Sequence, residues 1–134
     1  MSASEFLPMA ALKLGAERFD RGEWWDAHEA WEDGWRATGG KHRHYLKGLI
    51  QLAAANYHLD RGHPRAARRL FDGAARHLAE SEPLRWPFDT GVLLAACATA
   101  AARLDAGRTV AAVRPCLLPM MAAWTERAEE EGQA

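Results

Sequence analysis

A histidine and several carboxylates stand among tryptophans in the segment Glu23–Trp35, which reads EWWDAHEAWEDGW. At about 100° per helical residue, one side of His28 carries Trp24, Trp31 and Trp35, all within about 60° of it. Glu32 lies one turn after His28, about 40° to its other side. Because burying an ionisable group without a partner is costly, we expect His28 and Glu32 to have polar partners inside the protein.

The expected partners lie in the segment His42–Arg61, which we expect to form the next helix. Its apolar residues cover almost the whole circumference, which is typical of a central helix that is buried on several sides. The remaining stripe holds Gln51 and His58, seven residues apart and therefore on one line. We expect this pair to meet His28 and Glu32 between the two helices, in a seam lined by the tryptophans. The candidate ligand-binding residues are Trp24, His28, Trp31, Glu32, Trp35, Gln51 and His58.

Three interpretations of this cluster remain open. In the first, the polar side chains form a structural network that fixes the register of the two helices. In the second, His28 and Glu32 bind a divalent metal ion and His58 adds a third ligand. In the third, Glu32 orients His28 as a general base and Gln51 donates a hydrogen bond to a substrate oxygen. A catalytic site would therefore use His28 and Glu32, in a metal-assisted or acid–base hydrolysis.

The sequence excludes two well-known types of metal site. A zincin helix carries a second histidine at the position that Glu32 occupies here. A ferritin-like site requires Glu-x-x-His on two helices and two further carboxylates, and the chain does not have this pattern. A site formed by His28, Glu32 and His58 would be of neither type.

The sequence around these residues resembles a known family. The stretches FDRGEWWDAHEAWEDGWR and GLIQLAAANYHLDRGHPRAARRL are similar to the prokaryotic family called domain of unknown function 309 (DUF309). The family's motif positions are occupied by Phe19, Gly22, Ala27, His28, Glu29, Glu32, Trp35, Gly48, Leu49, Gln51 and His58. The resemblance covers a core of about residues 16–78, and it leaves a C-terminal helical part at 81–128 with little support. It implies a small all-helical fold and no particular activity.

The composition also favours helices. The chain has 134 residues, with 28 alanines and 15 leucines but only three valines and one isoleucine, and β-branched residues are the ones that favour strands. We expect one all-α domain over residues 1–134, folded as a compact bundle of about six helices. Helices are expected at residues 8–19, 23–37, 42–61, 64–80 and 89–107. A final helix is expected to be interrupted by Pro115 and Pro119 and to fray into the acidic tail at 129–131.

A short pattern that ends in glycine recurs three times: Phe19-Asp20-Arg21-Gly22, Leu59-Asp60-Arg61-Gly62 and Leu104-Asp105-Ala106-Gly107. Each glycine permits a left-handed turn, and an alanine five residues later, at 27, 67 and 112, lets the returning helix pack closely. The pattern predicts stacked helical hairpins similar to a tetratricopeptide (TPR-like) array. Such a stack could instead be a scaffold that binds a protein partner or a second copy of the chain. Apolar residues of the third hairpin would form that surface: Leu117, Leu118, Met120, Met121 and Trp124.

Charge argues against several partners. The net charge of −1 is not typical of a dedicated binder of nucleic acid or of an anionic membrane. One local exception is Lys41-His42-Arg43-His44, which follows two glycines at an expected helix start and could hold an anion, although it is not a P-loop.

The expected location is the cytoplasm. The N-terminus lacks the features of a signal peptide, and the longest apolar run, Val92–Ala102, is too short to cross a bilayer. The two cysteines, Cys97 and Cys116, form no CxxC motif, so they support neither a zinc knuckle nor a redox site.

Overall fold

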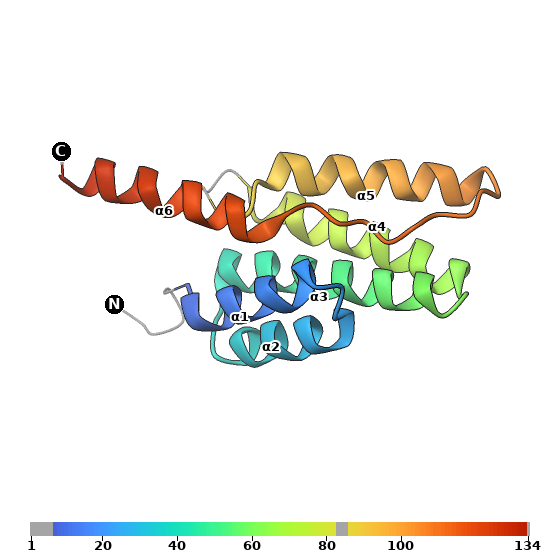
Figure 1. The fold of residues 1–134 in the computed structure, drawn as a ribbon, viewed down its shortest axis with the longest axis horizontal. Helices are drawn as coiled ribbons and strands as arrows, with labels where there is room; N and C mark the ends of the chain where they lie inside the picture. The colour runs from blue at the N-terminus through green and yellow to red at the C-terminus, as the bar shows by residue number, and fades with distance from the viewer. Residues whose placement is uncertain (1–6, 83–85, 134) are drawn as a thin grey trace.

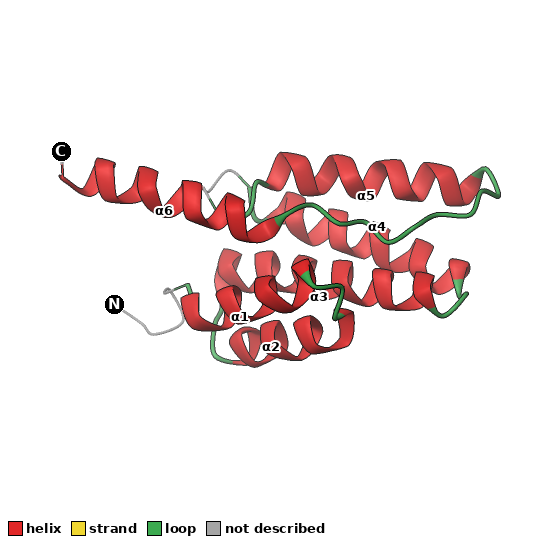
Figure 2. Cartoon of the chain, viewed as in Figure 1, coloured by secondary structure: helices red, strands yellow, loops and turns green. Residues whose placement is uncertain are grey.

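The protein folds into helices alone in residues 7–82 and 86–133, the parts of the chain that the computed structural model describes (Figures 1 and 2). The helices are α1 (Met9–Asp20), α2 (Trp24–Arg36), α3 (Gly40–Asp60), α4 (Pro64–Glu80), α5 (Thr90–Asp105) and α6 (Leu117–Gln133). The predicted all-α class and the predicted number of helices are confirmed. Within the described ranges, every helix is too short or too polar to span a membrane.

Helix α3 is the centre of the bundle, as its apolar circumference predicts. It packs against α2 on one side and against α4 on the other, and α1 and α5 extend the two sides (Figure 1). Its buried residues cover more than half of the helix circumference, and they include Tyr45, Ile50, Leu52 and Ala55. Helix α6 returns to pack against α1, so the last helix contacts the first.

The three glycines of the repeated pattern have the left-handed conformation that was predicted for them. Their φ angles are 78° at Gly22, 74° at Gly62 and 74° at Gly107, a region that favours glycine because it has no Cβ. The alanines that follow the first two turns, Ala27 and Ala67, are fully buried where their helices meet a neighbour. Two helical hairpins are therefore built as the pattern predicts.

The aspartate two residues before each of these glycines binds to a distant part of the fold. The Asp20 carboxylate accepts hydrogen bonds of 2.9 Å from each of the first two amides of α6. Asp60 accepts one of 2.7 Å from the indole of Trp24, and Asp105 accepts one of 2.8 Å from Arg68. Each turn is thus connected to a helix that it does not directly precede or end.

The third hairpin differs from the prediction. The segment between α5 and α6 is extended and runs back along the bundle (Figure 2). The amide group of Asn56 holds it by donating to the carbonyl oxygen of Val113, at 2.7 Å, and accepting from its N–H, at 2.8 Å. Pro119 does not interrupt α6, because it lies in the first turn, where a backbone N–H has no helical acceptor. The acidic tail does not fray in this structure, since α6 continues to Gln133.

Residues 86–89, directly before α5, close one end of the core. Asp89 is the N-cap of α5 and accepts a 3.1 Å hydrogen bond from the N–H of Val92. Trp86 and Phe88 are buried, and the hydroxyl of Tyr45 both donates to the carbonyl of Phe88 and accepts from its N–H. This end of α3 is therefore fixed to the α4–α5 connection.

Candidate functional site

Trp24 and Trp31 contact different elements, although they share a face of α2. Trp31 is fully buried, and its indole N–H donates to the carbonyl of Leu12 on α1 at 3.2 Å. Trp24 packs edge-on against Phe19 and donates to Asp60. Trp24 and Trp31 are therefore core residues that connect α2 to its neighbours.

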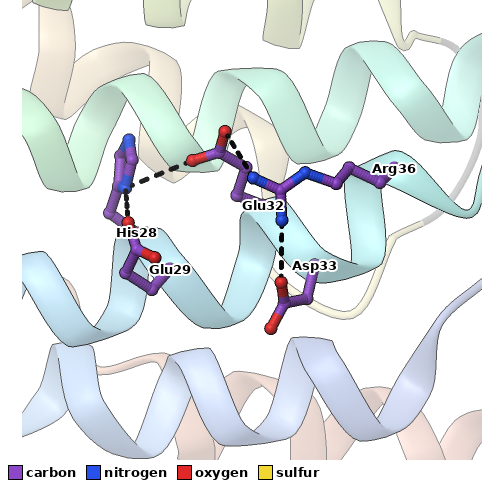
Figure 3. Close-up of polar contacts among 5 residues, drawn as sticks. All are labelled: His28, Glu29, Glu32, Asp33 and Arg36. Atoms are coloured by element: carbon purple, nitrogen blue, oxygen red, sulfur yellow. Dashed lines mark hydrogen bonds and ion pairs between the residues drawn. The ribbon is translucent and has the colours of Figure 1, made fainter.

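A cluster of three ionisable side chains lies on α2 beside this core. The Nδ1 atom of His28 is 3.4 Å from Oε1 of Glu29 and 3.6 Å from Oε2 of Glu32. One potential ligand atom from each residue lies within 4.8 Å of the other two. Figure 3 shows the imidazole and the two carboxylates turned toward one another. We call these three residues the His28 cluster.

Arg36 holds one side of the His28 cluster. Its guanidinium contacts Oε1 of Glu32 at 3.3 Å and Oδ1 of Asp33 at 3.0 Å (Figure 3). The two oxygens of Glu32 are therefore directed to different partners, one to Arg36 and the other to His28. The contact with Arg36 thus orients the Glu32 carboxylate so that its Oε2 atom points toward the imidazole of His28.

The imidazole of His28 is fixed by an aromatic neighbour. The ring of Trp25 stacks on it with a centroid distance of 4.8 Å and an interplanar angle of 12°. Trp25 also contacts Tyr57 of α3 and is itself 51% exposed. Nδ1 of His28 is shielded from solvent, and in the described part of the chain it has no partner with hydrogen-bond geometry. The cluster thus contains a buried nitrogen that faces two carboxylates without a hydrogen bond.

Gln51 and His58 do not join His28 and Glu32, so the expected meeting of four side chains is wrong. The Oε1 atom of Gln51 lies against Gly73 of α4, in the space that a Cβ at position 73 would need. Nδ1 of His58 lies 3.4 Å from Nδ1 of His63, at the turn into α4. The stripe on α3 that carries Gln51 and His58 therefore faces α4. There, Gly73 has no side chain and leaves room for the amide group of Gln51.

The surroundings of His58 are positively charged. Partial burial lowers the pKa of its imidazole from the usual 6.5, and the nearby His63, Arg61 and Arg69 lower it further. His58 has its own environment at the α3–α4 turn, away from the His28 cluster.

Two members of the site were not among the residues chosen from the sequence by helical spacing. Glu29 is rotated by about 100° from His28 on the helix, so helical spacing alone places it away from the imidazole. Its side chain is 54% exposed but long enough to curve back to Nδ1. Trp25 lies about 60° from His28, on the side of Glu32, and was likewise not chosen. The available signal for Glu29 was its place beside His28 in the motif His-Glu-x-x-Glu.

The chain is a small helical bundle that carries a His-Glu-x-x-Glu motif on its second helix. The family model of DUF309, described as a domain of unknown function, matches residues 12–70. This segment covers most of α1, all of α2 and α3, and the start of α4, and it includes the whole His28 cluster. This match supports the resemblance to the DUF309 family over residues 12–70. Comparisons with curated proteins and with solved structures found no match.

Proposed function

We propose that the protein binds a divalent transition-metal ion through Nδ1 of His28 and one carboxylate oxygen each of Glu29 and Glu32. The observation that carries this proposal is the spacing of these atoms. Tetrahedral zinc, with bonds of about 2.0–2.2 Å, has ligand–ligand distances of about 3.3–3.6 Å. The separations of 3.4 and 3.6 Å between His28 and the two carboxylates fit these edges.

The charges of the cluster support a cation. Two carboxylates that approach the same imidazole nitrogen repel each other, and Arg36 contacts only the outer oxygen of Glu32. A divalent ion would offset this repulsion and give the unbonded Nδ1 a partner. One nitrogen and two oxygens as donors favour Zn²⁺ or a similar transition metal, because Mg²⁺ and Ca²⁺ prefer oxygen ligands alone.

The chemistry of such a site follows from its number of ligands. Three protein ligands leave one position of a tetrahedral ion for water, as in hydrolytic zinc sites. The metal-assisted hydrolase considered from the sequence would therefore use Glu29 as its third ligand in place of His58. The metal-free acid–base alternative lacks its expected donor, because Gln51 faces α4. In this proposal the protein acts in the cytoplasm, where the thiols of Cys97 and Cys116 would stay reduced.

The proposal is tested by titrating chelator-treated protein with ZnCl₂ in a calorimeter and by recording the visible spectrum with Co²⁺. We expect one equivalent to bind, with the absorption of a tetrahedral Co²⁺ complex. His28→Gln and Glu29→Gln should each weaken binding by more than about tenfold.

The matched control is His63→Gln, which removes an exposed imidazole elsewhere and should leave the affinity unchanged. Circular dichroism of each variant checks that the fold is retained. Equal Zn²⁺ affinity in the wild type and His28→Gln would refute the metal site. If the two proteins bind Zn²⁺ equally and His28→Gln has a much lower free energy of unfolding than the wild type, the cluster is a structural network that fixes the helices.

A further inference from the structure

A second polar region lies at the end of the bundle where α3 begins and where α2 and α4 end (Figure 1). A cavity of about 550 Å³ opens there. Its wall includes six side chains that can contact a ligand: Trp35, Lys41, Arg43, His44, Lys47 and His77. A volume of this size lies within the range of about 300–1,000 Å³ that small-molecule sites have. We call this cavity the α3 pocket.

Positive charge predominates in the α3 pocket. Three of its lining side chains are cationic, and Glu80 is the one acidic residue among the lining residues. Arg43 and Lys47 lie over the ring of Trp35, at 3.8 and 4.8 Å from its centroid. In the ranges that the structure describes, neither Arg43 nor Lys47 forms an ion pair with a carboxylate. The ring attracts these cations but does not neutralise them.

Lys41 is held at the edge of the pocket. Its ammonium donates hydrogen bonds of 3.0 Å to the carbonyl oxygens of Glu80 and Glu82, at the end of α4. The first turn of α3 begins at Gly40, also in the wall, and its N-terminus adds partial positive charge. The positive groups are therefore positioned before any ligand arrives.

Two histidines complete the pocket. The Nδ1 atoms of His44 and His77 are 3.2 Å apart, so one ring donates and the other accepts. Burial lowers the pKa of His77 from its usual 6.5, and the positive groups His44, Arg76 and Lys47 lower it further, while Glu80 opposes them. The imidazole pair lies in a positive potential that an anion would reduce.

We propose that the α3 pocket binds a small phosphorylated molecule through its phosphate group, at a site separate from the His28 cluster. Arg43 can donate two parallel hydrogen bonds to phosphate oxygens, and Lys47 adds a second full charge. The His44–His77 pair supplies one more donor, the Nε2–H of the ring whose Nδ1 accepts. A phosphate monoester fits these groups because it carries nearly two negative charges on closely spaced oxygens.

The first experiment measures binding of inorganic phosphate, pyrophosphate and a hexose monophosphate by calorimetry at constant ionic strength. Arg43→Gln and Lys47→Gln should each weaken the binding of the best of these ligands by about tenfold. The matched control is Lys13→Gln on α1, which changes the net charge equally and should have little effect. Equal affinities in Lys47→Gln and Lys13→Gln would overturn the proposal.

The choice of ligands separates possible sources of the phosphate. Tighter binding of the hexose monophosphate than of inorganic phosphate supports a phosphorylated metabolite. Tighter binding of inorganic phosphate or pyrophosphate would overturn the proposal that the ligand has an organic part. Citrate tests charge alone, and affinity equal to that of the phosphates would contradict phosphate recognition. Tighter binding of a single-stranded oligonucleotide that depends on Arg43 and Lys47 would also contradict a small-molecule site.

Sulfate provides a second readout, because it remains a dianion between about pH 8 and about pH 6 while a histidine changes its protonation. We expect sulfate affinity to rise as the pH falls, since the bound anion favours protonation of His77. The charged groups facing this pair are Lys47 on α3 and Arg76 and Glu80 on α4. His77→Gln should flatten the pH profile, and an unchanged profile in this variant would exclude the pair from the site.

Discussion

Gly15 of α1 leaves open the space that the indole ring of Trp31 occupies. A Cβ at position 15 would overlap the Nε1, Cδ1 and Cε2 atoms of this indole. Trp31 is fully buried and is fixed by the hydrogen bond from its N–H to the carbonyl of Leu12, so it has little room to move. The contact between α1 and α2 therefore depends on a glycine in the middle of a helix.

Gly15→Ala should lower the free energy of unfolding by about 1–3 kcal/mol, because overpacking outweighs the gain of about 1 kcal/mol from the better helix former. Urea unfolding followed by circular dichroism measures the change. In a Trp31→Leu background, Gly15→Ala should become neutral or stabilising, because the indole ring that the new Cβ would overlap is absent. A destabilisation that persists in that background would show that the indole is not its cause.

The Asp20 carboxylate caps α6 from the far end of the chain, and this contact can be tested separately. Asp20→Ala should cost about 1–2 kcal/mol and speed hydrogen exchange at the first two amides of α6, Leu117 and Leu118. Asp33→Ala is the control, because Asp33 is an exposed residue whose only described ion pair is with Arg36 on the surface. If both variants exchange equally fast at these amides, Asp20 does not anchor the helix.

The local parts of the fold could be predicted from the sequence. Glycine at 22, 62 and 107 predicts the turns, because the left-handed conformation is a property of single residues. The closeness of His28 and Glu32 follows from spacing on one helix. Each of these features involves residues that are close together along the chain.

The direction of Gln51 and His58 could not be predicted, because it depends on which neighbour packs against each face of α3. A helix that is apolar nearly all round does not indicate whether its polar stripe faces α2 or α4. Gly73, twenty-two residues after Gln51, decides this by making room for the amide. The contact between Glu29 and His28 could not be predicted for a different reason. Helical angles give the direction of each Cβ, but they do not give the position of the carboxylate at the end of a long side chain.

The two cysteines should differ strongly in reactivity. Cys97 is buried in α5, and burial raises the pKa of its thiol to about 12, whereas Cys116 is exposed before α6. A thiol reagent at about pH 8 should therefore modify one cysteine quickly and the second only after denaturation. Cys116→Ser should abolish the fast phase. Rapid modification of two thiols in the native wild type would mean that α5 opens readily.

The lowered pKa values of His58 and His77 make the folded state sensitive to acid. Each group binds protons less readily in the folded protein than in the unfolded chain, so its contribution to stability is present above its usual pKa of 6.5. This contribution is lost as the pH falls through the lowered folded-state value. Stability should therefore decrease from about pH 7 to about pH 5.

Urea unfolding of the wild type and His77→Gln at several pH values isolates the contribution of His77, because the titration of carboxylates is common to both proteins. The variant should lose less stability than the wild type as the pH is lowered, and the difference between the two should be greatest below pH 6.5, the usual pKa of the imidazole. The physical reason is that acid must place a charge on a partly buried ring that already faces His44, Lys47 and Arg76. Parallel pH profiles for the two proteins would show that His77 titrates alike in the folded and unfolded chains.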